Sequence, residues 1–272
     1  MRRAFAIAVD AFYRFLEDDG WAIASYIALS TLMALFPFLI LVTALAAFLG
    51  SENLADEVAN LLLDTWPKEV AGPIAGEAHR VLTITRGDVL TASAVFSVYF
   101  SSSGVESLRI GLNRAYDVKE TRNWLLLRIE SIAYVLVGAL ALLALAFLVV
   151  LAPLEATFTF VRFAVATSVI TVALFAVHKW LPAGRRRSSE IVVGIVATLV
   201  LWLAGGILFG RYLAEFASTY VTYYAGLASV MIALVFLYLT ASIFMYGGEL
   251  NSAICRPRNA DHEGGKATPG PD

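Results

Sequence analysis

The stretch AGLASVMIALVFLYLTASIFMYGG, residues 225–248, decides the fold of this chain, because no charged side chain interrupts it. A helix rises about 1.5 Å per residue, so this stretch covers roughly 36 Å, and the hydrocarbon core of a bilayer is about 30 Å thick. It therefore predicts a membrane-spanning helix. Four polar residues spaced i, i+4, i+8 and i+11 share one face of that helix: Tyr238, Ser242, Tyr246 and Glu249. Since lipid offers no hydrogen-bond partners, we expect this face to contact protein or water.

The composition indicates an integral membrane protein throughout. The chain has 272 residues, of which 59% are hydrophobic and 15% charged, whereas soluble domains carry about 25% charged residues. Its mean hydropathy is +0.75. The single cysteine, Cys255, excludes an intrachain disulfide, and the three histidines are too far apart in sequence for metal-ligand spacing. We therefore expect an all-α polytopic fold with no metal and no cofactor.

Six uncharged or nearly uncharged stretches predict six membrane-spanning helices. Their approximate ranges are residues 23–49, 89–105, 131–154, 156–177, 191–210 and 225–248. Residues 1–19 predict an amphipathic helix at the cytoplasmic interface, because Phe5, Val9, Phe12 and Leu16 share one face. Residues 51–87 predict an extracytoplasmic loop with helical stretches. The polar, Gly- and Pro-containing residues 255–272 predict a disordered cytoplasmic tail that follows the membrane domain, residues 20–254.

Several spans carry polar features that admit two interpretations. Pro37 kinks the first span, and Tyr26 and Ser30 lie on the same face; this face is either a cavity wall or an ordinary packed kink. The second span has a stripe of small polar residues, Ser93, Ser97 and Ser101, which either lines a path or allows close helix packing. We expect Arg162 in the fourth span to reach the interface by snorkelling.

Charged and amide side chains gather near the ends of the spans. Those following the second span are Glu106, Arg109, Asn113 and Arg114; Glu130 precedes the third span, and Glu249 and Asn251 end the last. An ionisable group at the mouth of a membrane domain is a functional candidate. Glu249 either pairs with Arg109 or Arg114 in one conformational state and is released in another, or forms a static salt bridge that anchors the last span.

The distribution of positive charge predicts the orientation. Of the 20 Lys and Arg residues, 15 lie in the terminal segments and in the loops after the second and fourth spans. Four lie on the opposite side: Lys68, Arg80, Arg86 and Arg211. By the positive-inside rule, both termini are cytoplasmic.

The order of short motifs resembles the YihY/virulence factor BrkB family of bacterial inner-membrane proteins. The motifs are Ala24-Ser25-Tyr26, Phe36-Pro37, Leu112-Asn113-Arg114-Ala115-Tyr116, Trp180-Leu181-Pro182, Gly194, Tyr224-Ala225-Gly226-Leu227-Ala228 and Gly248-Glu249-Leu250-Asn251. The resemblance covers roughly residues 20–254 and implies six spans with cytoplasmic termini in a bacterial inner membrane. One departure is Asp117, where the family pattern has a glycine.

Three functions follow as hypotheses. The first is a transporter or flippase-like exporter of an amphipathic envelope substrate, since some members of the family that it resembles are linked to lipid export; membrane lipids, with an anionic lipid as substrate, are then its partners. The second is a non-transporting membrane scaffold or envelope-integrity factor. The third, a membrane enzyme, has no nucleophile–base spacing to support it.

The family that the chain resembles carries an old label, ribonuclease BN. The sequence has no clustered metal ligands, so we expect neither nuclease activity nor a nucleic-acid partner. Homo-oligomerisation stays open.

Overall fold

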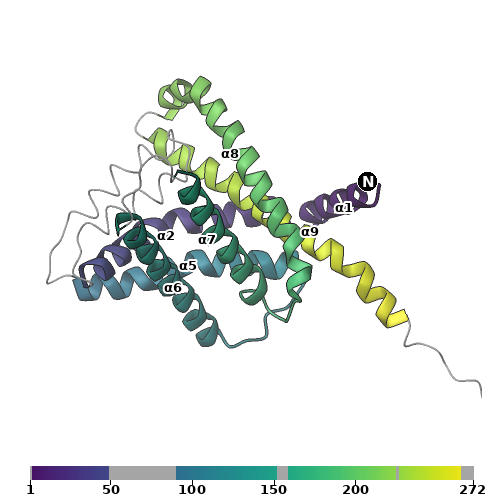
Figure 1. The fold of residues 1–272 in the computed structure, drawn as a ribbon. Coiled ribbons are helices and arrows are strands. Elements are labelled where there is room, and N and C mark those ends of the chain that lie inside the picture. Colours follow the sequence, from purple (N-terminus) through teal and green to yellow (C-terminus); the bar gives the residue numbers. More distant parts are fainter. Residues whose placement is uncertain (1, 49–89, 152–158, 225–226, 265–272) are drawn as a thin grey trace, which may run out of the picture.

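The computed structural model describes residues 2–48, 90–151, 159–224 and 227–264 of the chain. Within these ranges every regular element is a helix (Figure 1). The helices are α1 (Arg2–Glu17), α2 (Gly20–Phe48), α5 (Leu90–Ala115), α6 (Trp124–Leu151), α7 (Thr159–Trp180), α8 (Ser188–Tyr224) and α9 (Ala228–Gly264). The prediction of an all-α chain is thus confirmed for the described part. The predicted loop at residues 51–87 and the side chains of Ser93 and Arg162 lie outside it.

Four helices contain a segment long and apolar enough to cross a bilayer. These segments are Gly20–Val42, Trp124–Ala146, Ser188–Phe216 and Val230–Cys255. Helix α7 contains a shorter apolar segment, Ala164–Trp180, and α5 carries charged residues in its second half. The chain is therefore a multi-pass α-helical membrane protein. That α5 and α7 cross the membrane, and that both termini are cytoplasmic, remain predictions.

Some helices extend beyond the ranges that hydropathy suggested. Helix α5 continues to Ala115, so the charged residues that follow the second predicted span belong to the same helix. Helix α9 continues to Gly264, so residues 255–264 of the predicted disordered tail are helical in this structure. Leu250 and Ala253 of α9, which precede this segment, form a buried cluster with Ala11 of α1. This contact holds α9 against α1 beyond Gly248, where the apolar run ends.

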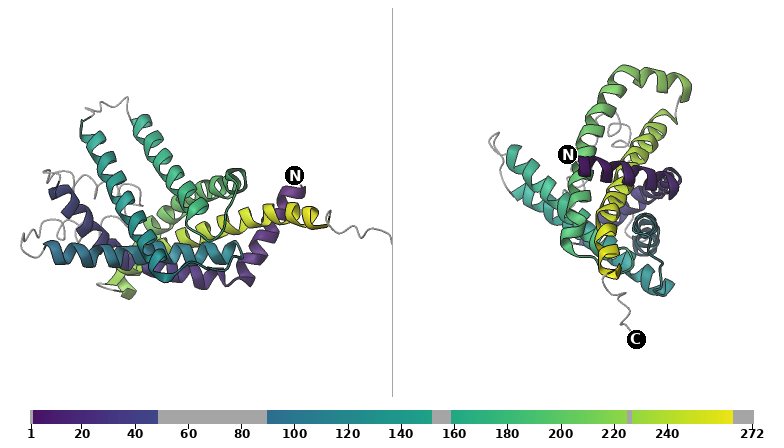
Figure 2. Two further views of the ribbon diagram at one scale, coloured as in Figure 1. Left: turned by 90° about the horizontal axis from the view of Figure 1, so that it is seen from below. Right: turned by 90° about the vertical axis from the view of Figure 1, so that its right-hand side faces the viewer.

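The helices pack most extensively where α2 lies along α5 and α9, and where α8 lies along α9. Figure 2 shows that α6 and α7 project away from this group of helices, while α1 lies beside the later part of α9. Helices α8 and α9 approach closely at Gly194 and Gly247, where an added Cβ at Gly194 would collide with the Gly247 carbonyl oxygen. Helix α2 remains one helix through Pro37.

Two aspartates in left-handed backbone conformations end helices. Asp117, with φ of 52°, ends α5, and Asp19, with φ of 55°, lies between α1 and α2. The left-handed region favours glycine, but Asp tolerates it better than most residues. The turn at Asp117 therefore has a conformation that suits glycine, the residue expected at this position from the resemblance.

Candidate functional site

The ends of α5 and α7 and the later part of α9 meet the starts of α2, α6 and α8 in one polar region, which we call the polar end. Three contacts across this region define it. Asn113 of α5 accepts a hydrogen bond of 2.7 Å from the backbone N–H of Ala183, which follows α7. Asn251 of α9 accepts one of 2.6 Å from the N–H of Gly194 in α8. Arg114 forms an ion pair of 3.4 Å with Asp18 in the turn before α2.

A chain of charged side chains ties α5 to the start of α6. Arg109 donates a hydrogen bond of 2.6 Å to Ser131 and lies 3.8 Å from Glu130. Glu130 also accepts from Arg122 at 2.8 Å. Arg122 in turn pairs with Glu120 at 2.8 Å, and Glu120 accepts a hydrogen bond from Asn113. Opposite charges alternate along the chain, so each buried charge has a partner of the other sign.

The pKa values of these charged side chains follow from burial and from ion pairing. Hydrogen bonds from Arg122 lower the pKa of Glu120 to about 2. The carboxylate of Glu120 raises the pKa of Arg122. Burial lowers the pKa of Arg109, and the carboxylate of Glu130 opposes that effect. Glu120 and Arg122 therefore stay ionised at neutral pH, and their ion pair helps to hold the helices together.

A second network surrounds the Tyr116 hydroxyl. This hydroxyl lies 2.8 Å from Nδ1 of His178 and accepts a hydrogen bond of 3.2 Å from Asn251. Because Asn251 also binds Gly194, the network joins α5, α7, α8 and α9. Burial raises the pKa of Tyr116, so its hydroxyl keeps its proton. The guanidinium of Arg186 stacks on the Tyr116 ring, 3.9 Å from the ring centroid.

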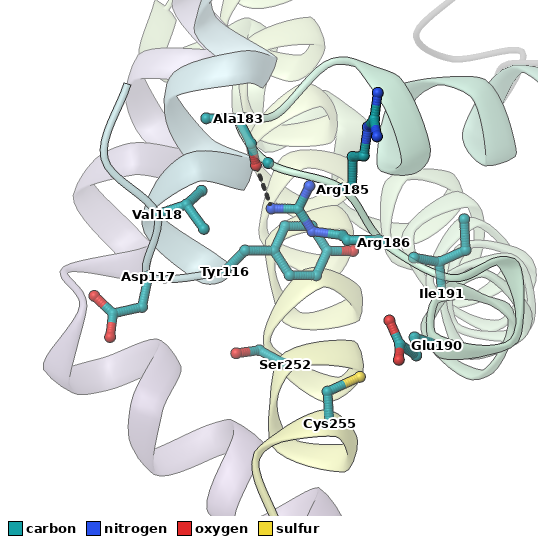
Figure 3. A pocket seen from close by; sticks show the side chains of 11 residues that line it. Tyr116, Asp117, Val118, Ala183, Arg185, Arg186, Glu190, Ile191, Ser252 and Cys255 are labelled. Atoms are coloured by element: carbon teal, nitrogen blue, oxygen red, sulfur yellow. Dashed lines mark hydrogen bonds between the residues drawn. The ribbon is translucent and has the colours of Figure 1, made fainter. Parts of the chain in front are cut away.

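Beside Tyr116 lies a cavity of about 290 Å³ (Figure 3). Its walls come from the end of α5, the turn before α8 and the later part of α9, and include Tyr116, Arg186, Glu190, Ser252 and Cys255. Arg186 donates to the Ala183 carbonyl at 3.0 Å, while its other terminal nitrogen is buried without a partner among the described residues. The two arginines and two carboxylates that line the cavity leave it with no dominant charge.

Glu249 of α9 is fully buried, and neither carboxylate oxygen has a hydrogen-bond partner among the described residues. Neither of the arginines that we considered as partners binds it in this structure. Arg109 is engaged with Glu130, and Arg114 with Asp18 and Asp19. Burying a carboxylate without a partner is costly. Glu249 is therefore the one described acidic side chain at the polar end whose burial the surrounding contacts do not explain.

The other predicted polar residues lie at helix contacts. On α9, Ser242 donates to the Tyr238 carbonyl of its own helix, and Tyr246 donates to the Ala8 carbonyl of α1 at 3.1 Å. Tyr238 packs beside Trp21 of α2. The predicted face of α9 thus contacts α1 and α2.

On α2 and α5, the predicted residues do not gather around either of the two cavities described in this article. Tyr26 is exposed, Ser30 and Pro37 are partly buried, and Ser97 and Ser101 are buried. A Cβ at Gly104 would lie 3.3 Å from Ala34 of α2, so this face of α5 packs closely on α2. Glu106 forms a 2.7 Å ion pair with Arg128 of α6.

Tertiary structure adds residues that sequence reasoning missed. These are Tyr116, Glu120, Arg122, Arg128, Ser131, His178 and Arg186. Arg122, Arg128 and Arg186 entered the sequence analysis only as topology signals, and His178 only as an isolated histidine. Tyr116 lies in the Asn-Arg-Ala-Tyr motif, which was the available signal. Among the described residues, no group of three or more His, Cys, Asp or Glu side chains is placed to hold a metal ion.

The fold and the polar end define a multi-pass all-α membrane protein whose helix ends are joined by buried polar networks. The virulence factor BrkB family profile matches residues 11–270, and the chain belongs to that family.

Among its relatives, the ribonuclease-like protein YfkH of Bacillus subtilis is 24% identical over 93% of this chain and 97% of its own length. A UPF0761 membrane protein of Coxiella burnetii is 25% identical over 93% of this chain and 94% of its own. Another, of Rhodospirillum centenum, is 28% identical over 92% of this chain, which spans 58% of that protein. No solved structure matches the chain.

Proposed function

We propose that this protein is a transporter of the bacterial cytoplasmic membrane that moves an amphipathic, anionic envelope substrate and has both termini in the cytoplasm. The observation that carries the proposal is Glu249, a fully buried carboxylate without a hydrogen-bond partner among the described residues. It lies in a segment apolar enough to span the membrane. Ionisable groups at such positions are rare, costly and commonly functional.

The neighbourhood of Glu249 supports a part in conformational change. Arg14, Asp18, Arg114 and Asp117 are the charged groups that act on it most. Arg114 is half exposed and forms two long ion pairs, of 3.4 Å with Asp18 and 3.7 Å with Asp19. A conformational state in which Arg114 leaves the aspartates for Glu249 would change the contact between the α1–α2 turn and α9. Two arrangements of one cation between competing carboxylates supply the bistable element that alternating access needs.

The proposal includes no ribonuclease chemistry, although one relative bears a ribonuclease-like name. The argument is chemical: metal-dependent hydrolysis of RNA needs ligands that converge on water. His178 instead is buried and engaged with Tyr116. Degradation of a structured RNA by the purified protein, lost on substitution of any one residue of this chain, would contradict this part.

The test of transport uses the whole protein in liposomes that contain fluorescent phosphatidylglycerol, with the label on the headgroup or the chain. We expect wild type to change the transbilayer distribution of the probe. Glu249→Gln should abolish this activity and leave folded yield unchanged, because glutamine keeps the shape of the side chain but cannot ionise. Glu17→Gln, which changes an exposed carboxyl on α1, is the matched control.

Two outcomes would overturn the proposal. If wild type and empty liposomes behave alike for phosphatidylglycerol and for other envelope lipids, the non-transporting scaffold is the better account. If Glu249→Gln lowers folded yield and activity equally, Glu249 has a structural role and no part in a transport cycle.

A further inference from the structure

An apolar groove runs along the membrane-spanning part of α8, and none of its lining residues lines the cavity beside Tyr116. It has a volume of about 790 Å³ and lies between α7, α8 and α9. Leu199, Leu203 and Ile207 line it from α8, and Leu239 and Ile243 from α9. The Trp202 indole donates a hydrogen bond of 2.9 Å to the Thr240 carbonyl and so joins α8 to α9 at one point along the groove.

Glycine gives the groove its depth. At Gly206 an added Cβ would meet no heavy atom within 4 Å, so the backbone of α8 faces open space there. Gly205, beside it, packs towards Ile243 of α9, which its Cβ would approach to 3.2 Å. The two neighbouring glycines therefore serve different purposes: Gly205 lets the helices meet, and Gly206 leaves the groove empty.

One end of the groove carries a single positive charge. Arg211 lines the groove, is exposed, and makes no hydrogen bond or ion pair with any described residue. Glu215, one turn further along α8, forms no ion pair with it. Next to Arg211, Tyr212 packs between Phe209 and Phe216. Aromatic clusters of this kind are typical of the boundary between hydrocarbon and headgroups.

The length of the groove matches one leaflet of a bilayer. From Leu199 to Arg211 a helix rises roughly 18 Å, and half of the hydrocarbon core is about 15 Å thick. From Ser188, where α8 begins, to Arg211 it rises roughly 34 Å, close to the full thickness of that core. With Ser188 at one interface, Arg211 reaches the level of the headgroups at the other, and the apolar groove extends from there towards the bilayer midplane.

We propose that the groove between α7, α8 and α9 is a binding site for one phospholipid, with an acyl chain lying over Gly206 and the headgroup phosphate against Arg211. The phosphate pairs with Arg211, which has no acidic partner among the described residues, and the acyl chain fills an apolar volume that opens to hydrocarbon. This inference does not rest on the proposed transport function, because a lipid held here needs no transport cycle.

The test is native mass spectrometry of the full-length protein released from micelles with added phosphatidylglycerol or diacylglycerol. Gly206→Leu places a side chain in the groove without displacing protein atoms next to its Cβ. Gly138→Leu is the control, since Gly138 lies in the spanning segment of α6 and its added Cβ also meets nothing within 4 Å. Arg211→Gln removes the charge and leaves the groove open.

We expect wild type and Gly138→Leu to hold one phosphatidylglycerol more tightly than diacylglycerol. Gly206→Leu should weaken both lipids by about tenfold or more, because the chain loses its site. Arg211→Gln should bring phosphatidylglycerol down to the affinity of diacylglycerol. All variants should unfold at the wild-type temperature.

Three results would overturn the inference. The first is unchanged lipid affinity in Gly206→Leu, and the second is equal loss in Gly138→Leu. The third is a dimer in wild type that Gly206→Leu converts to monomer without a change in bound lipid, because the groove would then hold a second copy of the chain.

Discussion

The side-chain amide oxygen of Asn251 lies 2.6 Å from the backbone nitrogen of Gly194 and accepts its hydrogen bond. Such a contact needs the two helices to lie almost against one another, since a short asparagine side chain has to reach the backbone of the facing helix. Gly194 and Gly247 provide that approach. The amide nitrogen of Asn251 then donates to Tyr116, so one buried side chain orients three helices.

Gly194→Ala should destabilise the protein by about 2 kcal/mol, within the usual range for an overpacked helix contact. Its Cβ would collide with the Gly247 carbonyl oxygen and lie 2.5 Å from the Asn251 amide. Thermal unfolding in micelles, followed by tryptophan fluorescence, measures the effect. Gly138→Ala, with open space around its Cβ, should unfold at the wild-type temperature; an equal shift in both would show that the α8–α9 crossing is not the cause.

Tyr116→Phe should cost roughly 1–3 kcal/mol, the usual effect of leaving buried polar groups without partners. The change removes the hydroxyl shared by His178 and Asn251, both fully buried, and keeps the ring under Arg186. Denaturant unfolding in mixed micelles gives the free energy. Tyr13→Phe, at an exposed tyrosine of α1, is the control, and a Tyr116→Phe protein as stable as this control would mean that the network adds nothing.

Acidification should weaken the chain of charged side chains that ties α5 to the start of α6. The pKa of Glu120 is about 2 in the folded protein, below the ordinary 4.5. A carboxyl whose folded pKa is depressed stabilises the protein fully above its unfolded pKa and loses that contribution as pH falls through the window from about 4.5 to 2.

We expect Glu120 to contribute on the order of 2 kcal/mol to the free energy of unfolding. Solvent screening keeps the value this low, because the side chain is partly exposed. The measurement is the unfolding temperature of wild type and Glu120→Gln between pH 6 and pH 2. The difference between the two should be largest at pH 6 and shrink as the pH approaches 2. Parallel curves across this window would contradict the assignment to Glu120.

Arg128→Lys should destabilise the protein by about 1–2 kcal/mol even though it keeps the charge. Arg128 pairs with Glu106 at 2.7 Å, donates to the Tyr99 carbonyl at 2.9 Å and lies 3.8 Å above the Tyr99 ring. A lysine supplies a point charge but not the planar fork that makes the three contacts together. Arg185→Lys, at an exposed arginine, is the control; a similar small shift in both would show that charge alone suffices at position 128.

The sequence by itself determined the class of the protein, because uncharged stretches of bilayer length and a shortage of charge are properties of composition and order along the chain. It also singled out polar residues near the ends of the predicted spans, among them Arg109, Asn113, Glu249 and Asn251. The left-handed turn at Asp117 was not predicted, since the sequence showed only that an aspartate stands where a glycine was expected.

Only the tertiary structure decided which of these groups meet. Arg109 contacts Glu130 and Ser131, and Arg114 forms an ion pair with Asp18. Glu249 is therefore buried with no hydrogen-bond partner among the described residues. Helical periodicity places residues on a face but does not say which helix covers it, and partners such as Tyr116 and His178 lie 62 positions apart. The apolar groove at Gly206 likewise depends on how α7, α8 and α9 are arranged, and no local sequence pattern predicts that arrangement.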